Sequence, residues 1–229
     1  MGIELATAGG VARLFLNRPQ KANALDSPLL SDLLSALESA SKTPDLRVLV
    51  LGGHGRAFCG GADVNELKSL TASTAGRFVE RIHEVCAAIR RLPVPVVARL
   101  HGAVIGAGLE IAAACDLRIA AEGTRFAMPE VRLGIPSVVE AALLPRLIGS
   151  GRAAWLVLTG EAIDARRAFE WGLVEELGDD ESLERLVGVL LKNDPRALKA
   201  QKALLQLWQE APLAESVSRS IEAFARLHA

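Results

Sequence analysis

The chain has 229 residues, of which 50% are hydrophobic and 23% are charged, with 26 basic and 27 acidic side chains. This composition excludes a disordered or low-complexity protein and allows a sizeable buried core. A formal net charge of −1 gives no overall attraction to nucleic acid or to an anionic membrane, so neither is an expected partner. The longest apolar stretch, 102–115, is interrupted by Glu110 and is shorter than the ~20 residues that span a membrane.

The cysteines and histidines favour a reducing compartment and argue against a metal site. Cys59, Cys86 and Cys115 form no Cys-x-x-Cys pair and leave an odd count, which disfavours a disulfide framework or a zinc site. The histidines show no metal-ligand spacing, so no metal ion is expected. The first residues lack a charged start followed by an apolar run, so no signal peptide is expected. These features predict a cytoplasmic protein.

The chain up to residue 136 alternates between strand and helix patterns. A helix is predicted after Ser27, which offers an N-cap with Pro28 at the first helical position, and another is predicted over 64–91. Short apolar runs predict buried strands over 11–16, 46–51, 95–100 and 117–120. Strands separated by helices imply crossover connections and mostly parallel pairing. We therefore expect an α/β layer architecture.

From about Ser137 onward the pattern is almost entirely helical. Apolar residues recur at three- and four-residue spacing over 138–148, 152–158, 165–171, 183–192, 196–208 and 213–227. No linker rich in serine and glycine separates the two parts. We therefore expect residues 1–136 to form the core and residues 137–229 to form a helical extension of the same functional unit. Helices with no sheet to cover usually pack on one another or on a neighbouring subunit.

Two segments rich in glycine each follow a predicted strand and are candidates for ligand contact. They are AFCGGAD over 57–63 and GAVIGAGLE over 102–110. Neither matches a nucleotide-phosphate loop. Small residues let backbone N–H groups approach a ligand closely, and at a helix N-terminus these donors face negative charge, so two such loops would suit an oxyanion hole. The alternative is that the glycines only make tight turns.

Two glutamates lie in apolar surroundings. Glu110 stands between GAGL and IAAAC, and Glu130 follows a Met-Pro pair. An unpaired buried carboxylate is costly. Two such carboxylates can divide acid and base roles, because burial and mutual repulsion separate their pKa values. The alternative is structural: Glu110 pairs with an arginine, and Glu130 caps a turn.

Several blocks of the sequence occur together in a recognisable order: FLNRPQKANALD, AFCGGAD, HGAVIGAGLEIAAACDLRIAAEGTRFAMPEVRLGIP and LPRLIG. In this order they resemble the conserved blocks of the crotonase superfamily, the enoyl-CoA hydratases and isomerases, from about Val11 to Leu177. The resemblance implies an α/β fold with a spiral ββα core and a C-terminal helical extension. It also implies an acyl-CoA thioester substrate, no separate cofactor because CoA is part of the substrate, and homotrimers that often stack into hexamers.

The resemblance also implies roles for particular residues. Glu110 and Glu130 match the two catalytic glutamates of the hydratases, and the N–H groups of Gly60 and Ala107 match the oxyanion hole. The adenine end of CoA would lie near the backbone of Ala22, Ala62 and Asp63, and its phosphates would meet Arg18, Lys21 and Arg56. The alternative for these three cations is an ordinary solvated surface, and Asp63 also suits the N-cap of the next helix.

These features predict an enoyl-CoA hydratase, which adds water across the 2,3 double bond of a 2-enoyl-CoA thioester. One alternative is a Δ3,Δ2-enoyl-CoA isomerase or another acyl-CoA enzyme of the same superfamily. Another is a family member that binds acyl-CoA without catalysis. The presence of both glutamates favours hydration, because a double-bond shift can run on one base.

The segment SVVE, which ends at Glu140, departs from the small, glycine-rich segment that is usual at this place in hydratases of the superfamily. Ser137 and Glu140 have the spacing of a capping box, in which each side chain bonds to the backbone N–H of the other residue. We therefore expect a helix with Ser137 as its N-cap. The alternative directs the Glu140 carboxylate into the acyl pocket as a third acid beside Glu110 and Glu130.

Overall fold

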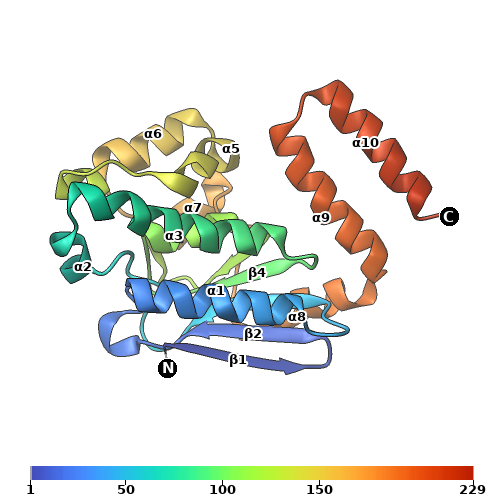
Figure 1. Ribbon diagram of the computed structural model, residues 1–229, viewed down its shortest axis with the longest axis horizontal. Helices are drawn as coiled ribbons and strands as arrows, with labels where there is room; N and C mark the ends of the chain where they lie inside the picture. Colours follow the sequence, from blue (N-terminus) through green and yellow to red (C-terminus); the bar gives the residue numbers. More distant parts are fainter. Residues whose placement is uncertain (1, 229) are drawn as a thin grey trace.

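The computed structural model describes residues 2–228 (Figure 1). A six-stranded sheet lies at its centre, in the order β1-β2-β3-β4-β6-β9. Its strands are β1 (Ile3–Ala8), β2 (Val11–Leu16), β3 (Val48–Gly53), β4 (Val96–Leu100), β6 (Leu117–Ala120) and β9 (Glu176–Leu177). β1 and β2 pair antiparallel, and every later pair in this sheet is parallel. The predicted α/β architecture with mostly parallel pairing is confirmed.

A second, three-stranded sheet has the order β5-β7-β8. It contains β5 (Ala103–Ile105), β7 (Arg125–Ala127) and β8 (Ile163–Asp164). These strands were not predicted, because two or three residues are too short to show a period of two. β8 and β9 both come from the part of the chain after residue 137, so this part contributes to both sheets as well as supplying helices.

Helices connect and cover these strands. They are η1 (Pro19–Lys21), α1 (Ser27–Ser41), α2 (Val64–Ser69), α3 (Ala72–Arg91), α4 (Ala107–Ala114), η2 (Glu130–Leu133), η3 (Val139–Leu143), α5 (Leu144–Ile148), α6 (Ser150–Thr159), α7 (Ala165–Trp171), α8 (Asp180–Lys192), α9 (Pro195–Glu210) and α10 (Leu213–Arg226). None of the helices within residues 2–228 is long and apolar enough to cross a membrane.

Two predicted helix boundaries differ from those observed. The helix expected over 64–91 is two helices, because Leu70 is extended and Thr71 serves as the N-cap of α3. The N-cap of α1 is Asp26 rather than Ser27, since the Asp26 carboxylate accepts the Leu29 N–H at 3.0 Å. Both differences reflect a side chain that satisfies free N–H groups at a helix start.

The main sheet is covered on both faces, which explains why its central strands are apolar without alternation. All six residues of β3 are buried. One face packs against α1 and α3, which lie across the sheet in Figure 1. The other face packs against α8 through Leu183, Val187 and Leu190. All eight residues of α4 are buried, so this helix is a core element with side chains packed all around it.

The last two helices form a hairpin at one side of the molecule (Figure 1). α9 is fixed to the body by the buried Lys202, whose ammonium group lies 2.7 Å from Asp116 Oδ2. The same group donates to the carbonyls of Ile89 (3.1 Å) and Val94 (2.9 Å). Beyond this attachment the hairpin exposes large apolar side chains: Leu205, Trp208, Leu213, Val217, Ile221 and Phe224.

Candidate active site

The two predicted glycine-rich segments lie side by side and are joined by backbone hydrogen bonds. The Cys59 N–H donates to the Ala103 carbonyl at 3.0 Å, and the Ile105 N–H donates to the Cys59 carbonyl at 3.0 Å. A Cβ on Gly61 would lie 2.9 Å from the Ile105 carbonyl oxygen. A Cβ on Gly108 would lie 2.7 Å from that of Cys59. These glycines therefore allow a close approach of two backbones as well as turning the chain.

The backbone donors near this junction differ from the predicted pair. The Gly60 N–H donates to the Ala22 carbonyl at 2.8 Å, so it is occupied and does not face a ligand. The expected role of Gly60 therefore does not fit the structure. The N–H groups of Ala62 and of Ala107, the first residue of α4, have no acceptor within residues 2–228. Ala62 was expected near CoA, but its free N–H makes it the better partner for Ala107.

Glu110 is 4% exposed and projects from the first turn of α4. Burial, with a smaller contribution from the charges of Glu130 and Glu140, raises the pKa of its carboxyl group to about 8. The backbone N–H of Ala141 opposes this rise. No arginine forms an ion pair with Glu110 in the described part of the chain, so the structural alternative for this residue does not hold.

Glu130 is the first residue of η2 and lies against the start of α4. Its Oε1 occupies the space that a Cβ on Gly106 would need, and Gly106 has a φ of +52°. Its Oε2 accepts the Ser137 hydroxyl at 2.9 Å. Because Gly106 is the N-cap of α4 and its carbonyl accepts the Glu110 N–H at 3.0 Å, the two glutamates meet at the same end of this helix.

The environments of the two glutamates raise the pKa of both carboxyl groups. Burial raises the pKa of Glu130, but the Ser137 hydroxyl opposes this rise by stabilising the carboxylate. Glu110 is the more deeply buried of the two and lies under the repulsion of its neighbour. Glu110 therefore holds a proton at neutral pH, and the different environments of the two groups suit a division into acid and base.

The capping box predicted for Ser137 and Glu140 is wrong. η3 begins at Val139 and has no side-chain cap. The Ser137 hydroxyl instead donates to Glu130, and Glu140 Oε1 lies 2.8 Å from His83 Nδ1. The backbone between them is strained, because Val139 has a φ of +40°, a region that β-branched residues avoid. Partners distant in the sequence have therefore displaced the local pattern.

An open apolar cavity of about 600 Å³ adjoins the two glutamates. It is bordered by Ser137, which bonds to Glu130, and by Ala141, whose N–H faces Glu110. The remaining walls come from η2, η3, α5 and α6 and include Val131, Val138, Pro145, Ala153, Val157 and Leu158. This cavity has the size and apolar character of a small-molecule site and is suited to a hydrocarbon chain.

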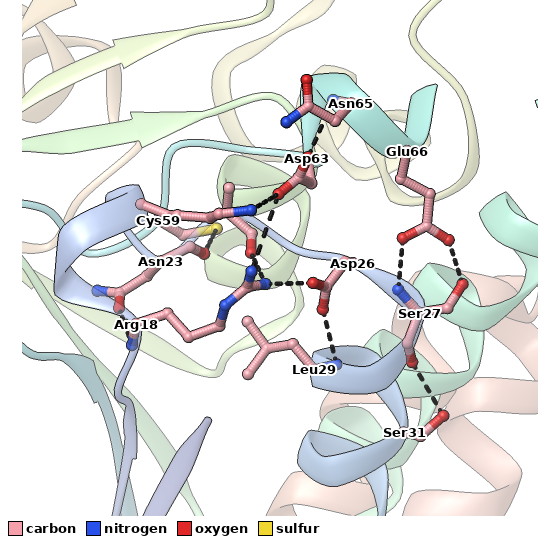
Figure 2. A network of polar contacts seen from close by, with 12 residues as sticks. Arg18, Asn23, Asp26, Ser27, Leu29, Ser31, Cys59, Asp63, Asn65 and Glu66 are labelled. Carbon is pink, nitrogen blue, oxygen red and sulfur yellow. Dashed lines mark hydrogen bonds and ion pairs between the residues drawn. The ribbon is translucent and has the colours of Figure 1, made fainter. Parts of the chain in front are cut away.

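Two of the residues expected to contact CoA, Arg18 and Asp63, belong to a polar network at the start of α1 and α2 (Figure 2). Arg18 lies 2.6 Å from Asp26 Oδ2 and is 17% exposed, so its charge is already neutralised. Lys21 lies 3.4 Å from Asp63 Oδ2 and is 48% exposed. Asp63 also caps α2 by accepting the Asn65 N–H at 2.9 Å, as the sequence indicated. Arg56 is exposed and forms no ion pair with any of residues 2–228.

Asn23 is a structural residue that the sequence reasoning missed. It is fully buried, and its Nδ2 donates to the carbonyls of His54 (2.9 Å) and Ala57 (2.8 Å). Its Oδ1 accepts the Arg18 N–H at 2.8 Å. Asn23 therefore joins the loop after β2 to the loop after β3, and no local pattern could have found it.

The cysteines are packing residues. Burial raises the pKa of Cys59 and of Cys115 to about 12, so both thiols stay protonated. Cys86 is also buried, and burial raises the pKa of its thiol above the ordinary value. Within residues 2–228 no three His, Cys, Asp or Glu side chains gather in a way that would hold a metal ion.

A mostly parallel α/β core brings a buried and a half-buried carboxylate beside free backbone N–H groups, an arrangement typical of enzymes that use acid–base chemistry. The family model for enoyl-CoA hydratase/isomerase matches residues 6–227. The crystal structure of enoyl-CoA hydratase from Thermoplasma volcanium superimposes with a TM-score of 0.96 at 31% identity, covering 100% of this chain and 92% of that one. The chain belongs to the enoyl-CoA hydratase/isomerase family, within the crotonase superfamily.

Relatives with different activities are equally similar to this chain. The 2,3-dehydroadipyl-CoA hydratase of Escherichia coli is 34% identical over 224 residues, which cover 96% of this chain and 87% of that protein. The trans-2-decenoyl-acyl-carrier-protein isomerase of Streptococcus mutans is 34% identical over 209 residues, which cover 88% and 80%. Sequence identity therefore establishes the family but does not separate hydratase from isomerase.

Proposed function

We propose that this protein is an enoyl-CoA hydratase that adds water across the 2,3 double bond of a 2-enoyl-CoA thioester. The observation that carries the proposal is the glutamate pair at the start of α4, where burial and repulsion raise the pKa of Glu110 to about 8 and the Ser137 hydroxyl stabilises the Glu130 carboxylate. Hydration needs both a base for water and an acid for carbon, and this pair supplies one of each.

The proposed reaction begins with the thioester carbonyl between the N–H groups of Ala62 and Ala107, which stabilise negative charge on its oxygen. Glu130 takes a proton from water as the hydroxide oxygen bonds to C3, and the electrons of the double bond move to form an enolate. The proton on Glu110 then passes to C2. A proton returns from Glu130 to Glu110 to restore the starting state. The proposal uses no cofactor beyond the CoA carried by the substrate.

We further propose that CoA lies along the loop containing Ala22, Ala62 and Asp63. Lys21 and Arg56 are the cations that we assign to its phosphates, because both are accessible. Arg18 is assigned a different role from the one expected, since it is engaged with Asp26 and the Ala24 carbonyl and therefore holds the loop in shape.

The same proposal includes assembly as a trimer or a dimer of trimers through the helices after Ser137, in the cytoplasm. It is supported by the apolar side chains that α9 and α10 expose, because a partner subunit would remove them from water. Light scattering is expected to give a multiple of three protomers, and a stable monomer would contradict this part. Cell fractionation tests the location.

The experiment that tests the reaction is incubation with crotonyl-CoA while the absorbance of the conjugated thioester is followed. A hydratase removes this absorbance, and Glu130→Gln is expected to stop the loss. Glu84→Gln is a matched control, because Glu84 is exposed on α3 and forms no ion pair within the described residues. If the absorbance stays unchanged even when the protein is in excess over crotonyl-CoA, the proposal is contradicted.

A second candidate is a Δ3,Δ2-enoyl-CoA isomerase, which the isomerase relative at 34% identity favours. An isomerase would create the conjugated absorbance from a 3-enoyl-CoA and would leave crotonyl-CoA intact. One of the two variants, Glu110→Gln or Glu130→Gln, would then retain much of the turnover, because a double-bond shift can run on one base. Binding of both thioesters with no turnover of either would indicate the third alternative, a family member that binds acyl-CoA without catalysis.

A further inference from the structure

Glu140 is a buried carboxylate that the proposed reaction does not use. It is 6% exposed and lies on η3, which packs against α3 and α4. Its Oε1 is 2.8 Å from His83 Nδ1, whereas its Oε2 is buried and has no hydrogen-bond partner within residues 2–228. A buried acceptor without a donor is costly. Since Glu140 caps no helix, its placement has no local structural explanation.

The groups that face Glu140 come from two helices. Glu110 lies on α4, against which η3 packs, and the charge of Glu140 raises the pKa of the Glu110 carboxyl group. His83 and Cys86 face it from α3, and Cys86 is a protonated, uncharged thiol. On α5 the charged residue is Arg146, which is exposed and forms no ion pair with Glu140. His83, whose side chain is 57% exposed, is thus the one possible counter-charge in this part of the described chain.

We propose that Glu140 is a positioning residue of the active site, which keeps the catalytic proton on Glu110, and that His83 fixes the Glu140 carboxylate in the place where it does so. This inference rests on the proposed function, because it assigns the return of the proton after each turnover. When Glu130 has taken a proton from water, the charge of Glu140 still draws that proton toward Glu110. Like charge at close range in a buried site favours the protonated form of its neighbour.

The pattern of shifts agrees with this geometry. The charge of Glu140 contributes to the raised pKa of Glu110, after burial and the charge of Glu130. The pKa of Glu130 is raised by burial, and the Ser137 hydroxyl opposes this rise. The charge of Glu140 therefore favours the protonated form of Glu110. The strained Val139 immediately before Glu140 is consistent with a segment held in place for this purpose.

The test is a titration of the Glu110 carboxyl group that does not depend on turnover. Full-length protein carrying 13C at the glutamate carboxyl carbons is titrated by NMR, and the Glu110 signal is identified by its loss in Glu110→Gln. We expect Glu140→Gln to lower the midpoint of this signal by about one pH unit. The alkaline limb of the kcat profile with crotonyl-CoA is expected to move to lower pH by the same amount, with KM little changed. Glu84→Gln is the control and is expected to leave the midpoint unchanged.

The melting temperature, compared with the Glu110 midpoint, separates this role from a structural one. A merely structural Glu140 would lower the Tm when replaced and leave the Glu110 midpoint unchanged, and an unchanged midpoint overturns the inference. Glu140→Met, which has a similar length and no charge, replaces the glutamine variant if the latter does not fold. A shifted midpoint in a protein that hydrates no enoyl-CoA would support the coupling of Glu140 to Glu110 and overturn the proposed function alone.

Discussion

The buried and half-buried charges of this protein fall into two regions that are built in opposite ways. At the start of α1 and α2, each charge has a partner, as in the pair of Arg18 with Asp26 and the pair of Lys21 with Asp63 (Figure 2). At the start of α4, Glu110, Glu130 and Glu140 are all acidic, and no arginine or lysine forms an ion pair with them in residues 2–228. Paired charges hold a loop in place, whereas Glu110 and Glu130, which have no cationic partner among residues 2–228, are the groups to which we assign proton exchange.

The largest effect is expected from removing the charge or the proton of the unpaired group. Glu110→Gln and Glu130→Gln should each lower kcat for crotonyl-CoA by about 10²- to 10⁴-fold, the range typical of general acid–base groups. The affinity for CoA, measured by calorimetry, should change little. If either variant turns over crotonyl-CoA as fast as the unchanged protein, the contrast between the two regions fails, because that carboxylate would then have no catalytic role.

The paired region should respond in stability instead of in rate. Lys202 belongs to this kind of region, since it neutralises Asp116 and satisfies two carbonyls while only 5% exposed. Lys202→Met should lower the free energy of unfolding by about 1–3 kcal/mol, because it leaves the partly buried Asp116 carboxylate and two buried carbonyls without their donor. Denaturant unfolding measures this, and kcat of the folded fraction should be kept.

The matched control for this variant is Lys199→Met, on the same helix. Lys199 is exposed and forms no ion pair within the described residues, so its loss should change the free energy of unfolding little. Equal destabilisation by the two substitutions would show that the buried contacts of Lys202 contribute nothing extra to the free energy of unfolding.

A smaller effect is expected when one carboxylate is displaced rather than removed. Gly106→Ala would put a methyl group where Glu130 Oε1 lies, at a φ of +52° that alanine avoids. We expect kcat to fall by about 10²-fold, because small misplacement of a catalytic group is costly. Gly188→Ala is the control, since a Cβ there meets nothing within 4 Å. Equal kcat values in the two variants would mean that Glu130 tolerates displacement.

The smallest effect concerns stability against pH. The pKa of Glu110 is raised by burial to about 8 in the folded chain from an ordinary value of 4.5, so the folded state holds this proton more tightly. Its contribution to the free energy of unfolding is complete below pH 4.5 and is lost as the pH rises through 8. Denaturant unfolding at several pH values should show a loss over this window that is smaller in Glu110→Gln. An identical pH dependence of the free energy of unfolding in both proteins would contradict a raised pKa for Glu110.

The sequence allowed strands of the core to be predicted and marked Glu110 as unusual, because both signals are local. β2 and β6 were predicted with their observed ends, because each is a short, mostly apolar run interrupted by a single arginine. Glu110 was conspicuous because a carboxylate within an apolar helix has no ordinary purpose. In both cases a few neighbouring residues carry the information.

The rest depended on partners that are distant in the sequence. The Gly60 N–H was assigned to an oxyanion hole, but the Ala22 carbonyl takes it. Ser137 and Glu140 match a capping box locally, but Glu130 and His83 compete successfully for their side chains. A local pattern predicts a bond only when no tertiary partner offers a better one.

The positive φ of Val139 has a consequence for engineering this enzyme. Glycine adopts this conformation without strain, so Val139→Gly is an obvious choice for a more heat-resistant variant. The same change would loosen the backbone that presents Glu140 to Glu110. A variant that gains thermostability at this position would therefore hold the Glu110 proton less firmly under the proposal made above. A screen for heat resistance alone would select such variants although their activity is lower.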